Sequence, residues 1–176
     1  RCHDYVAAEV EAVRTAVGAT EIANFAKHEI SGPGSREFLD YVLAGRIPKP
    51  GRIVLTPMLT TKGKLYGDLT VACYNEEKFI IYGSGAAQEM HRRWFEKFLP
   101  KDGVRYKNRS DDFHGIAISG PNSRKLLSRI CRDDVSASAL KFRDTRETFV
   151  GGVPAILNRI SFSGELGYEI YVAPQF

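Results

Sequence analysis

The chain has 176 residues, of which 43% are hydrophobic and 26% are charged, so a packed globular core is expected and intrinsic disorder is excluded. The net charge of +4 suits a small anionic ligand, but no run of Lys and Arg indicates nucleic acid. No apolar run approaches the ~20 residues of a membrane helix, and three widely spaced cysteines indicate neither a zinc site nor a disulfide framework.

The first predicted element is a helix capped by Asp4, with valines at helical spacing along one face and an end at Gly18. Residues 21–30, "EIANFAKHEI", predict a strand that leads into "SGPG". A second helix follows, with its apolar residues on one face, and stops at Gly45.

The middle of the chain predicts three successive strands and a helix that buries its aromatic residues. These are "IVLTPML", "KLYGDLTVACY" and "KFIIYGS", followed by the helix "AAQEMHRRWFEKF". The remainder predicts a strand, a helix and a hairpin, in the segments "GIAIS", "PNSRKLLSRIC", and "VPAILNRISFS" with "GYEIYV". Because the chain begins with Arg1 and stops at Phe176, just after a predicted strand, we expect it to be a fragment of a longer protein.

One ten-residue pattern occurs twice, as "ISGPGSREFL" at 30–39 and "ISGPNSRKLL" at 118–127. In each copy a strand ends in Ile-Ser-Gly-Pro and a helix begins, with Ser35 or Ser123 placed to cap it. The alternative is a common strand–turn–helix joint met twice by chance. We interpret the repeat as an internal duplication. The expected fold is α+β, with duplicated halves of mainly antiparallel sheet and packed helices, at about 19–103 and 104–176.

Asp68 is the first candidate for chemistry. In "KLYGDLTVACY" the alternation puts Leu65, Leu69 and Val71 on a core face and Asp68 with Tyr66 on the other. Aspartate is disfavoured in the middle of a strand, so a carboxylate there is typical of a half-polar pocket wall. The alternative is a solvated or ion-paired Asp on an exposed sheet face.

Two further carboxylates lie in "SFSGELGYEIYV". Glu165 is expected near the tip of a turn, and Glu169 on the returning strand beside Tyr171. A carboxylate in this setting could pair with a flat heterocycle, since two N–H groups on one ring edge match its two oxygens. The alternative is a turn residue and a solvated strand residue.

Other patterns are weaker. Gly83-x-Gly85 before a helix lacks the third glycine and the parallel context of a dinucleotide site, although the helix start could hold an anion. The histidines are expected not to converge, and no metal site is predicted; they are His3, His28, His91 and His114.

Taken together, "TPMLTTKGKLYGDLTV", "SGPNSRKLL" and "RISFSGELGYEIYV" resemble the folate-binding domain of the aminomethyltransferase (glycine cleavage T-protein) family. The resemblance runs from about Gly18 to Val172. Within the family, the motifs look most like the T-protein-like region of dimethylglycine and sarcosine dehydrogenases, which are flavoenzymes with an FAD domain. The resemblance implies a fold of two related α+β units.

The resemblance also implies roles for single residues. The family's Asp-Asp-Leu-x-Val becomes Gly67-Asp68-Leu69, so Asp68 is the expected catalytic residue. The Glu that holds the pterin ring corresponds to Glu169. An Asn of the family is replaced by the Gly-rich end of a strand, where Ser84 lies; Ser84, Tyr66 and Glu165 complete the predicted folate contacts.

The implied function is tetrahydrofolate-dependent one-carbon transfer in a dimethylglycine- or sarcosine-dehydrogenase-like flavoenzyme acting on a small N-methylated amine. FAD would bind only in a flanking domain, and a carboxyl-terminal barrel would follow. The alternatives are an aminomethyltransferase proper and a folate-binding module without turnover. We expect no nucleic-acid or membrane partner, and a location in the bacterial cytoplasm or the mitochondrial matrix.

Overall fold

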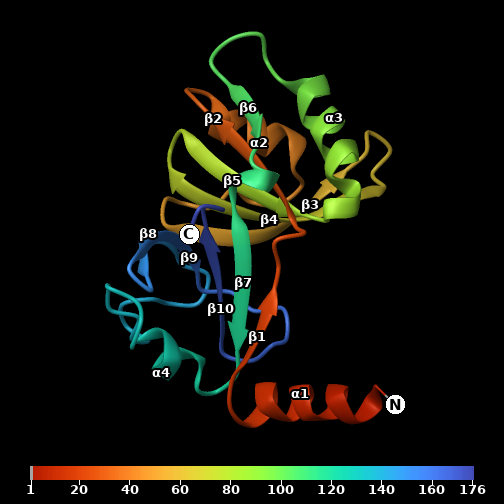
Figure 1. The fold of residues 1–176 in the computed structure, drawn as a ribbon. Coiled ribbons are helices and arrows are strands. Elements are labelled where there is room, and N and C mark those ends of the chain that lie inside the picture. The colour runs from red at the N-terminus through yellow and green to blue at the C-terminus, as the bar shows by residue number, and fades with distance from the viewer. Residues whose placement is uncertain (1) are drawn as a thin grey trace. The chain divides into compact units, whose positions relative to one another are not determined.

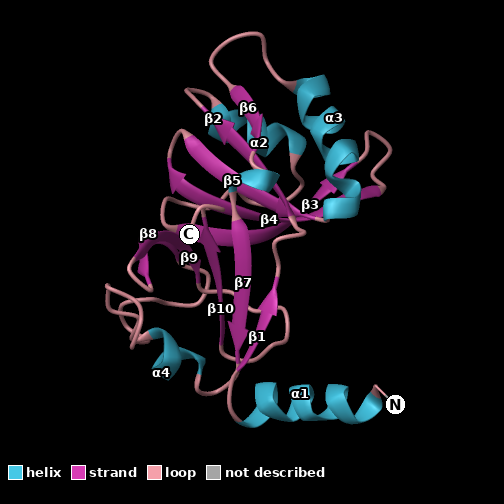
Figure 2. Cartoon of the chain, in the orientation of Figure 1, coloured by secondary structure: helices cyan, strands magenta, loops and turns pink. Residues whose placement is uncertain are grey.

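The computed structural model describes residues 2–176 and divides them into two compact units (Figure 1). The central unit is the continuous segment Asn24–Asp112. The terminal unit combines the residues up to Ala23 with Phe113–Phe176. Each unit is built around its own antiparallel sheet with helices, as Figure 2 shows by colour. The predicted α+β class is therefore confirmed.

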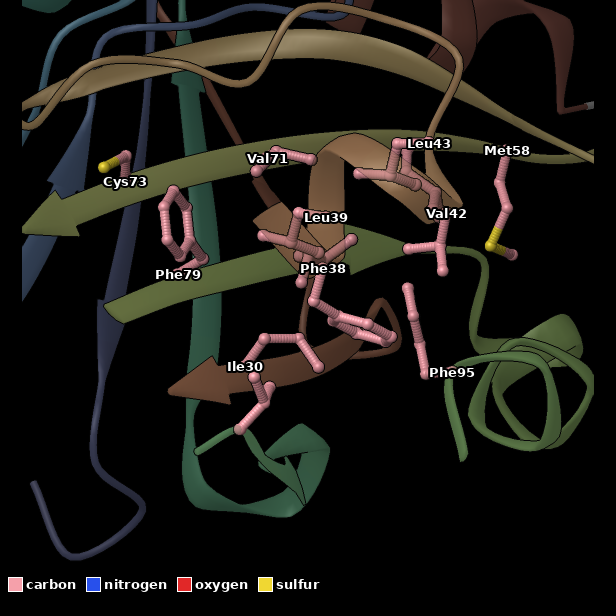
Figure 3. Close-up of a cluster of buried hydrophobic side chains, with 13 residues drawn as sticks. Ile30, Phe38, Leu39, Val42, Leu43, Met58, Val71, Cys73, Phe79 and Phe95 are labelled. Carbon is pink, nitrogen blue, oxygen red and sulfur yellow. The ribbon is translucent and has the colours of Figure 1, made fainter. Parts of the chain in front are cut away.

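The central unit holds a five-stranded sheet in the order β3-β4-β5-β2-β6. Its strands are β2 (Ala26–Ser31), β3 (Arg52–Leu59), β4 (Leu65–Asn75), β5 (Lys78–Gly83) and β6 (Arg105–Asn108). Its helices are α2 (Ser35–Val42), η1 (Gly85–Ala87), α3 (Gln88–Phe98) and η2 (Ser110–Asp112). Figure 3 shows its core, in which Phe38 and Leu39 of α2 and Phe95 of α3 pack with Val71 of β4 and other side chains of the sheet.

The terminal unit holds a second five-stranded sheet, in the order β1-β7-β10-β9-β8. Its strands are β1 (Gly18–Glu21), β7 (His114–Ser119), β8 (Thr145–Val150), β9 (Val153–Asn158) and β10 (Gly167–Val172), and its helices are α1 (His3–Thr15) and α4 (Ser123–Leu127). The core gathers on one sheet face, where Ile118, Leu157 and Tyr168 pack with Leu127 of α4. No described residue of α1 is buried, so the predicted valine face of this helix stays largely exposed.

The two sheets have the same strand order when they are read from corresponding edges: β3-β4-β5-β2-β6 and β8-β9-β10-β7-β1. The edge strands are exchanged between the copies. β1 precedes β2 in the chain but pairs with β7, and β6 precedes β7 but pairs with β2. The compact units therefore differ from the expected halves, 19–103 and 104–176, by these exchanged strands.

The repeated motif has the same backbone course in both copies. The strand ends at Ser31 or Ser119, and the next residue, Gly32 or Gly120, has a positive φ of 106° or 129°. A side chain on either glycine would also clash with a backbone carbonyl oxygen, at 2.4 Å from Gly103 or 2.5 Å from Ala16. Glycine is thus required twice for the same physical reason.

The predicted serine caps are wrong. Neither helix has a side-chain cap: the hydroxyl of Ser35 donates to the carbonyl of Gly32 at 2.6 Å, and that of Ser123 donates to Leu166 at 2.7 Å. Both serines are fully buried, and they tie the turn down from its inner side instead.

Several boundaries also differ from the sequence predictions. The strand predicted at 21–30 is broken into β1 and β2, which belong to different sheets, and the helix predicted at 121–131 is regular only over Ser123–Leu127. Strands β6 and β8 were not predicted. No described helix is long and apolar enough to cross a membrane.

Candidate functional site

Asp68 lies on β4 of the central unit, on the face opposite to the core residues Leu69 and Val71. Its partner across the ladder is Pro57 of β3. The side chain is exposed, while Thr70, the next residue on the same face, is half-buried. Within residues 2–176, no side chain forms an ion pair or hydrogen bond with the Asp68 carboxylate. The Asp68 carboxylate is therefore open to an incoming ligand.

Tyr66 lies away from Asp68, because the strand alternation is interrupted. Met58 pairs with Gly67 and Leu59 pairs with Leu65, so Tyr66 is the extra residue of a β-bulge. Its ring packs against Trp94 of α3, with ring centroids 4.7 Å apart. The predicted placement of Tyr66 on the face of Asp68 is therefore wrong.

Ser84 follows the last residue of β5 and directly precedes η1. β5 runs beside β4 with Tyr82 opposite Thr70. Continued by two residues, this register sets Ser84 across from Asp68. The Ser84 side chain is exposed, as is that of Asp68.

Two histidines converge behind this part of the sheet, against the prediction. The rings of His28 on β2 and His91 on α3 are 6.0 Å apart, and both side chains are buried. His28 Nδ1 shares a 2.8 Å hydrogen bond with the hydroxyl of Tyr106. Burial, and then the neighbouring His91, lower the pKa of His28 to about 4, against an opposing effect of Glu89.

The packing of His91 accounts for the two glycines nearby. A Cβ at Gly67 would lie 2.9 Å from His91 Nε2, and one at Gly83 would lie 3.1 Å from His91 Nδ1. The imidazole thus fills the space that a larger side chain at either position would need. The sequence did not predict this contact. The only sign of a close neighbour was that Gly67 and Gly83 each lie near the end of a strand.

Glu169 lies on β10 of the terminal unit, on the sheet face opposite to the core. The hydroxyl of Tyr171 donates to Glu169 Oε2 at 2.9 Å. Burial raises the pKa of the Glu169 carboxyl, while hydrogen bonding from Tyr171 and the nearby Asn158 amide opposes the rise. The carboxylate is therefore half-buried and oriented, unlike the exposed Asp68.

Asn158 and Thr145 extend this polar group across the sheet. Asn158 on β9 is opposite both Glu169 and Thr145 in the ladder, and the Thr145 hydroxyl donates to Asn158 Oδ1 at 2.7 Å. Sequence reasoning named neither residue, although an Asn at the end of the aliphatic run "AIL" was a visible signal.

Glu165 is held by another partner. Its carboxylate forms a 2.5 Å ion pair with Arg14 of α1. Asp68, Tyr66 and Ser84 thus belong to the central unit, and Glu165 and Glu169 to the terminal unit. No cluster of His, Cys, Asp and Glu side chains among the described residues could hold a metal ion. An open depression of about 440 Å³ beside α4 is lined by none of the predicted site residues.

Comparison with known proteins agrees with this fold. The family model of the "GCVT N-terminal domain" matches residues 1–176. Human mitochondrial dimethylglycine dehydrogenase is 36% identical over 169 residues, which cover 94% of this chain and 19% of that protein. Aminomethyltransferase from Listeria innocua serovar 6a is 32% identical over 169 residues, which cover 95% of this chain and 46% of the relative. The chain thus spans between a fifth and half of the curated relatives it matches.

Two solved structures share the fold. Glycine cleavage system aminomethyltransferase T from Bartonella henselae has a TM-score of 0.83 at 20% identity, over 94% of this chain and 44% of that chain. Heterotetrameric sarcosine oxidase from Corynebacterium sp. U-96 has a TM-score of 0.74 at 16% identity, over 99% of this chain and 86% of that chain.

Proposed function

Because the chain belongs to the family of the GCVT N-terminal domain, we propose that it binds tetrahydrofolate and takes part in the transfer of a one-carbon unit. The relatives at 36% and 32% identity are a dimethylglycine dehydrogenase and an aminomethyltransferase. Both names are those of enzymes, and one is a transferase, so an enzymatic, transferase-like domain is the common ground of the proposal.

The observation that carries the proposal is the setting of Glu169. Its carboxylate is half-buried, and Tyr171 and Asn158 lie beside it as hydrogen-bond donors. Oxygen atoms held in this way suit two adjacent N–H donors on a flat heterocycle, and the pterin ring of tetrahydrofolate presents such an edge. The residues present therefore fit the cofactor, and Glu169 is its proposed anchor.

Asp68 is the proposed catalytic residue. Tetrahydrofolate supplies a ring amine that accepts the one-carbon unit. The Asp68 carboxylate, which has no ion-pair partner among the described residues, would stabilise the positive charge that develops during transfer, and it would accept or relay the proton that the amine loses.

The remaining predicted contacts have different weights. Ser84 is exposed opposite the Asp68 position, so we keep it as a direct folate contact. The ring of Tyr66 packs against Trp94, and Glu165 is paired with Arg14. We therefore propose that Tyr66 and Glu165 support the site through packing and ion pairing, in contrast to the direct contact assigned to Ser84.

The proposed context is a dimethylglycine- or sarcosine-dehydrogenase-like flavoenzyme. In it, FAD binds in a flanking domain and oxidises a small N-methylated amine, a carboxyl-terminal barrel follows, and the compartment is the mitochondrial matrix or the bacterial cytoplasm. An aminomethyltransferase proper is the second candidate, favoured by the 32% identity to the Listeria innocua enzyme. The loss of one acidic residue at Gly67 favours a third candidate, a folate-binding module without turnover.

The test of the catalytic role is Asp68→Asn in the full-length protein, since the exchange is nearly isosteric and should leave the fold intact. We expect methylene-tetrahydrofolate to form about 10²–10⁴-fold more slowly, the usual effect of losing a positioned charge or base. Flavin reduction by the amine should continue, and the one-carbon unit should escape as formaldehyde. Flavin absorbance, formaldehyde and methylene-tetrahydrofolate are followed in parallel.

Asp40→Asn is the matched control, because Asp40 is another exposed aspartate of the central unit, on α2. It should partition its products like the parent protein. Parent-like partitioning in Asp68→Asn as well would remove Asp68 from the reaction. Product formation in the parent protein without flavin would favour the aminomethyltransferase, and no turnover at all would favour the binding module.

A further inference from the structure

A row of three residues crosses the terminal sheet at Glu169. Thr145 on β8 is opposite Asn158 on β9, and Asn158 is opposite Glu169 on β10. Residues opposite one another in a ladder point to the same sheet face. Asn158 is fully buried and Thr145 is 5% exposed, so both polar side chains are held inside the protein.

Thr145 fixes which way the Asn158 amide faces. Its hydroxyl donates to Asn158 Oδ1 at 2.7 Å, which places the oxygen of the amide on the β8 side. The Nδ2 group is then left for the β10 side, where Glu169 lies. This nitrogen is near enough to the carboxylate to oppose the rise of its pKa, yet it makes no hydrogen bond of good geometry within the described residues.

The duplicated sheet shows that the fold does not require this polar row. Since Ile30 corresponds to Ile118, the ladder registers make Ile80 the counterpart of Glu169, Ala72 that of Asn158 and Ile53 that of Thr145. All three counterparts are apolar and at most 2% exposed. The same three positions are thus polar together in one copy and apolar together in the other.

We propose that Asn158, oriented by Thr145, is a positioning residue that directs its Nδ2 group to the Glu169 carboxylate when a ligand with two adjacent N–H donors binds. Buried polar groups are rarely left without a partner, and the amide nitrogen has no other acceptor among the described residues. This inference rests on the proposed function, since it takes Glu169 as the anchor of the pterin edge.

The groups around Glu169 that can stabilise its ionised form are neutral hydrogen-bond donors. On its face of the sheet, β8 adds Glu147 and β10 adds Tyr171, while β1 and β7 present Thr20 and Ala117. The five described strands place no Lys or Arg on that face. The Asn158 amide and the Tyr171 hydroxyl are therefore the groups in the sheet that favour the ionised, acceptor-only carboxylate that an N–H edge needs.

The experiment measures tetrahydrofolate affinity by calorimetry as a function of pH in the full-length protein. Thr145→Val is nearly isosteric and removes the lock on the amide; Asn158→Leu removes the donor itself. In both variants the carboxyl group protonates more readily. We expect affinity to fall about 10-fold at neutral pH, and the pH below which binding is lost to rise by about one unit.

Thr145→Ser is the matched control, because it keeps the hydroxyl and should retain the parent pH profile. Thermal unfolding of each variant checks that the sheet persists, and a purely structural role would lower stability without moving the pH profile. If Glu169→Gln loses affinity while Thr145→Val and Asn158→Leu keep the parent profile, the positioning role is overturned and the folate site stands. If Glu169→Gln binds like the parent protein, the folate site is overturned, and the role of this row fails with it.

Discussion

The two copies of the repeated strand–turn–helix joint differ in how far their helices are buried. In α2 the side chains of Phe38 and Val42 are 6% and 7% exposed, whereas their counterparts near α4, Leu126 and Ile130, are 37% and 43% exposed. In the central unit, α3 packs beside this copy, and its Phe95 belongs to the same core cluster as Phe38. The same backbone motif thus carries a helix that is more deeply buried in the central unit than in the terminal unit.

The two sheets differ in the same direction, because the central sheet is also the more apolar copy. The central unit fills its row at Ile53, Ala72 and Ile80 with apolar groups, while the terminal unit places Thr145, Asn158 and Glu169 there. Apolar packing serves stability, and an oriented, half-buried carboxylate is costly to fold but suited to binding. The comparison fits a division of roles in which the apolar row serves stability and the polar row serves the proposed folate site.

Exchanging the character of the rows should have the largest effect. Ile80→Glu buries an unpaired charge, and we expect it to lower the free energy of unfolding by about 3–5 kcal/mol. Glu169→Ile should change it by only about 1 kcal/mol, because an apolar group replaces a half-buried carboxyl group, while folate binding is lost. Urea unfolding measures the first effect and calorimetry the second. Equal destabilisation by both changes would refute the division of roles.

Truncating the helix side chains tests the difference in burial. Phe38→Ala should lower the free energy of unfolding by about 3–5 kcal/mol, as expected for a buried aromatic residue. Leu126→Ala, at the equivalent position, should lower it by about 1 kcal/mol, since much of the side chain is already in water. Hydrogen exchange resolved to each unit gives both values. A larger loss for Leu126→Ala would mean that α4 is covered in solution.

Acid should weaken the central unit selectively, since its buried His28 has an exposed Ile116 as counterpart in the terminal unit. The folded-state pKa of about 4 lies below the ordinary value of 6.5, so unfolding takes up a proton between these values. The contribution of neutral His28 is complete above pH 6.5 and decreases as the pH falls to about 4, by about 3 kcal/mol in all.

His28→Gln keeps a hydrogen-bonding partner for Tyr106 without a titrating group, so its unfolding free energy should depend less on pH across that window. His114→Gln removes an exposed histidine of the terminal unit and should leave the dependence unchanged. Urea unfolding at a series of pH values compares the three proteins. If the unfolding free energy of His28→Gln depends on pH as steeply as that of the parent protein, buried His28 does not govern acid sensitivity.

Periodicity predicted those parts of the fold that are decided locally. The alternation in "KLYGDLTVACY" and the helical spacing around Phe38 and Leu39 gave elements that the structure confirms. The edge strands "GATE" and "RYKN" are short and largely polar, so they carry no pattern of their own. Their exchange between sheets depends on pairing between distant segments, which local sequence does not encode.

The candidate site was predicted to a similar depth. Motif positions pointed to Asp68 and Glu169, and the structure places both on non-core sheet faces, but their binding and catalytic roles stay predictions. A bulge moved Tyr66 to the opposite side, because a single extra residue reverses the alternation. Asn158 was identified only from the ladder register, and His91 only from its close approach to Gly67.

The central unit is an insertion in the chain of the terminal unit. The backbone N–H of Ile22 donates to the carbonyl of Gly115, and β2 pairs with β6. The chain therefore leaves the terminal unit and returns to it at neighbouring points. During synthesis the inserted segment is complete before β7, the pairing partner of β1, has been made. The terminal unit therefore completes its sheet last, and this sheet, which carries Glu169, forms only after the central unit has been synthesised.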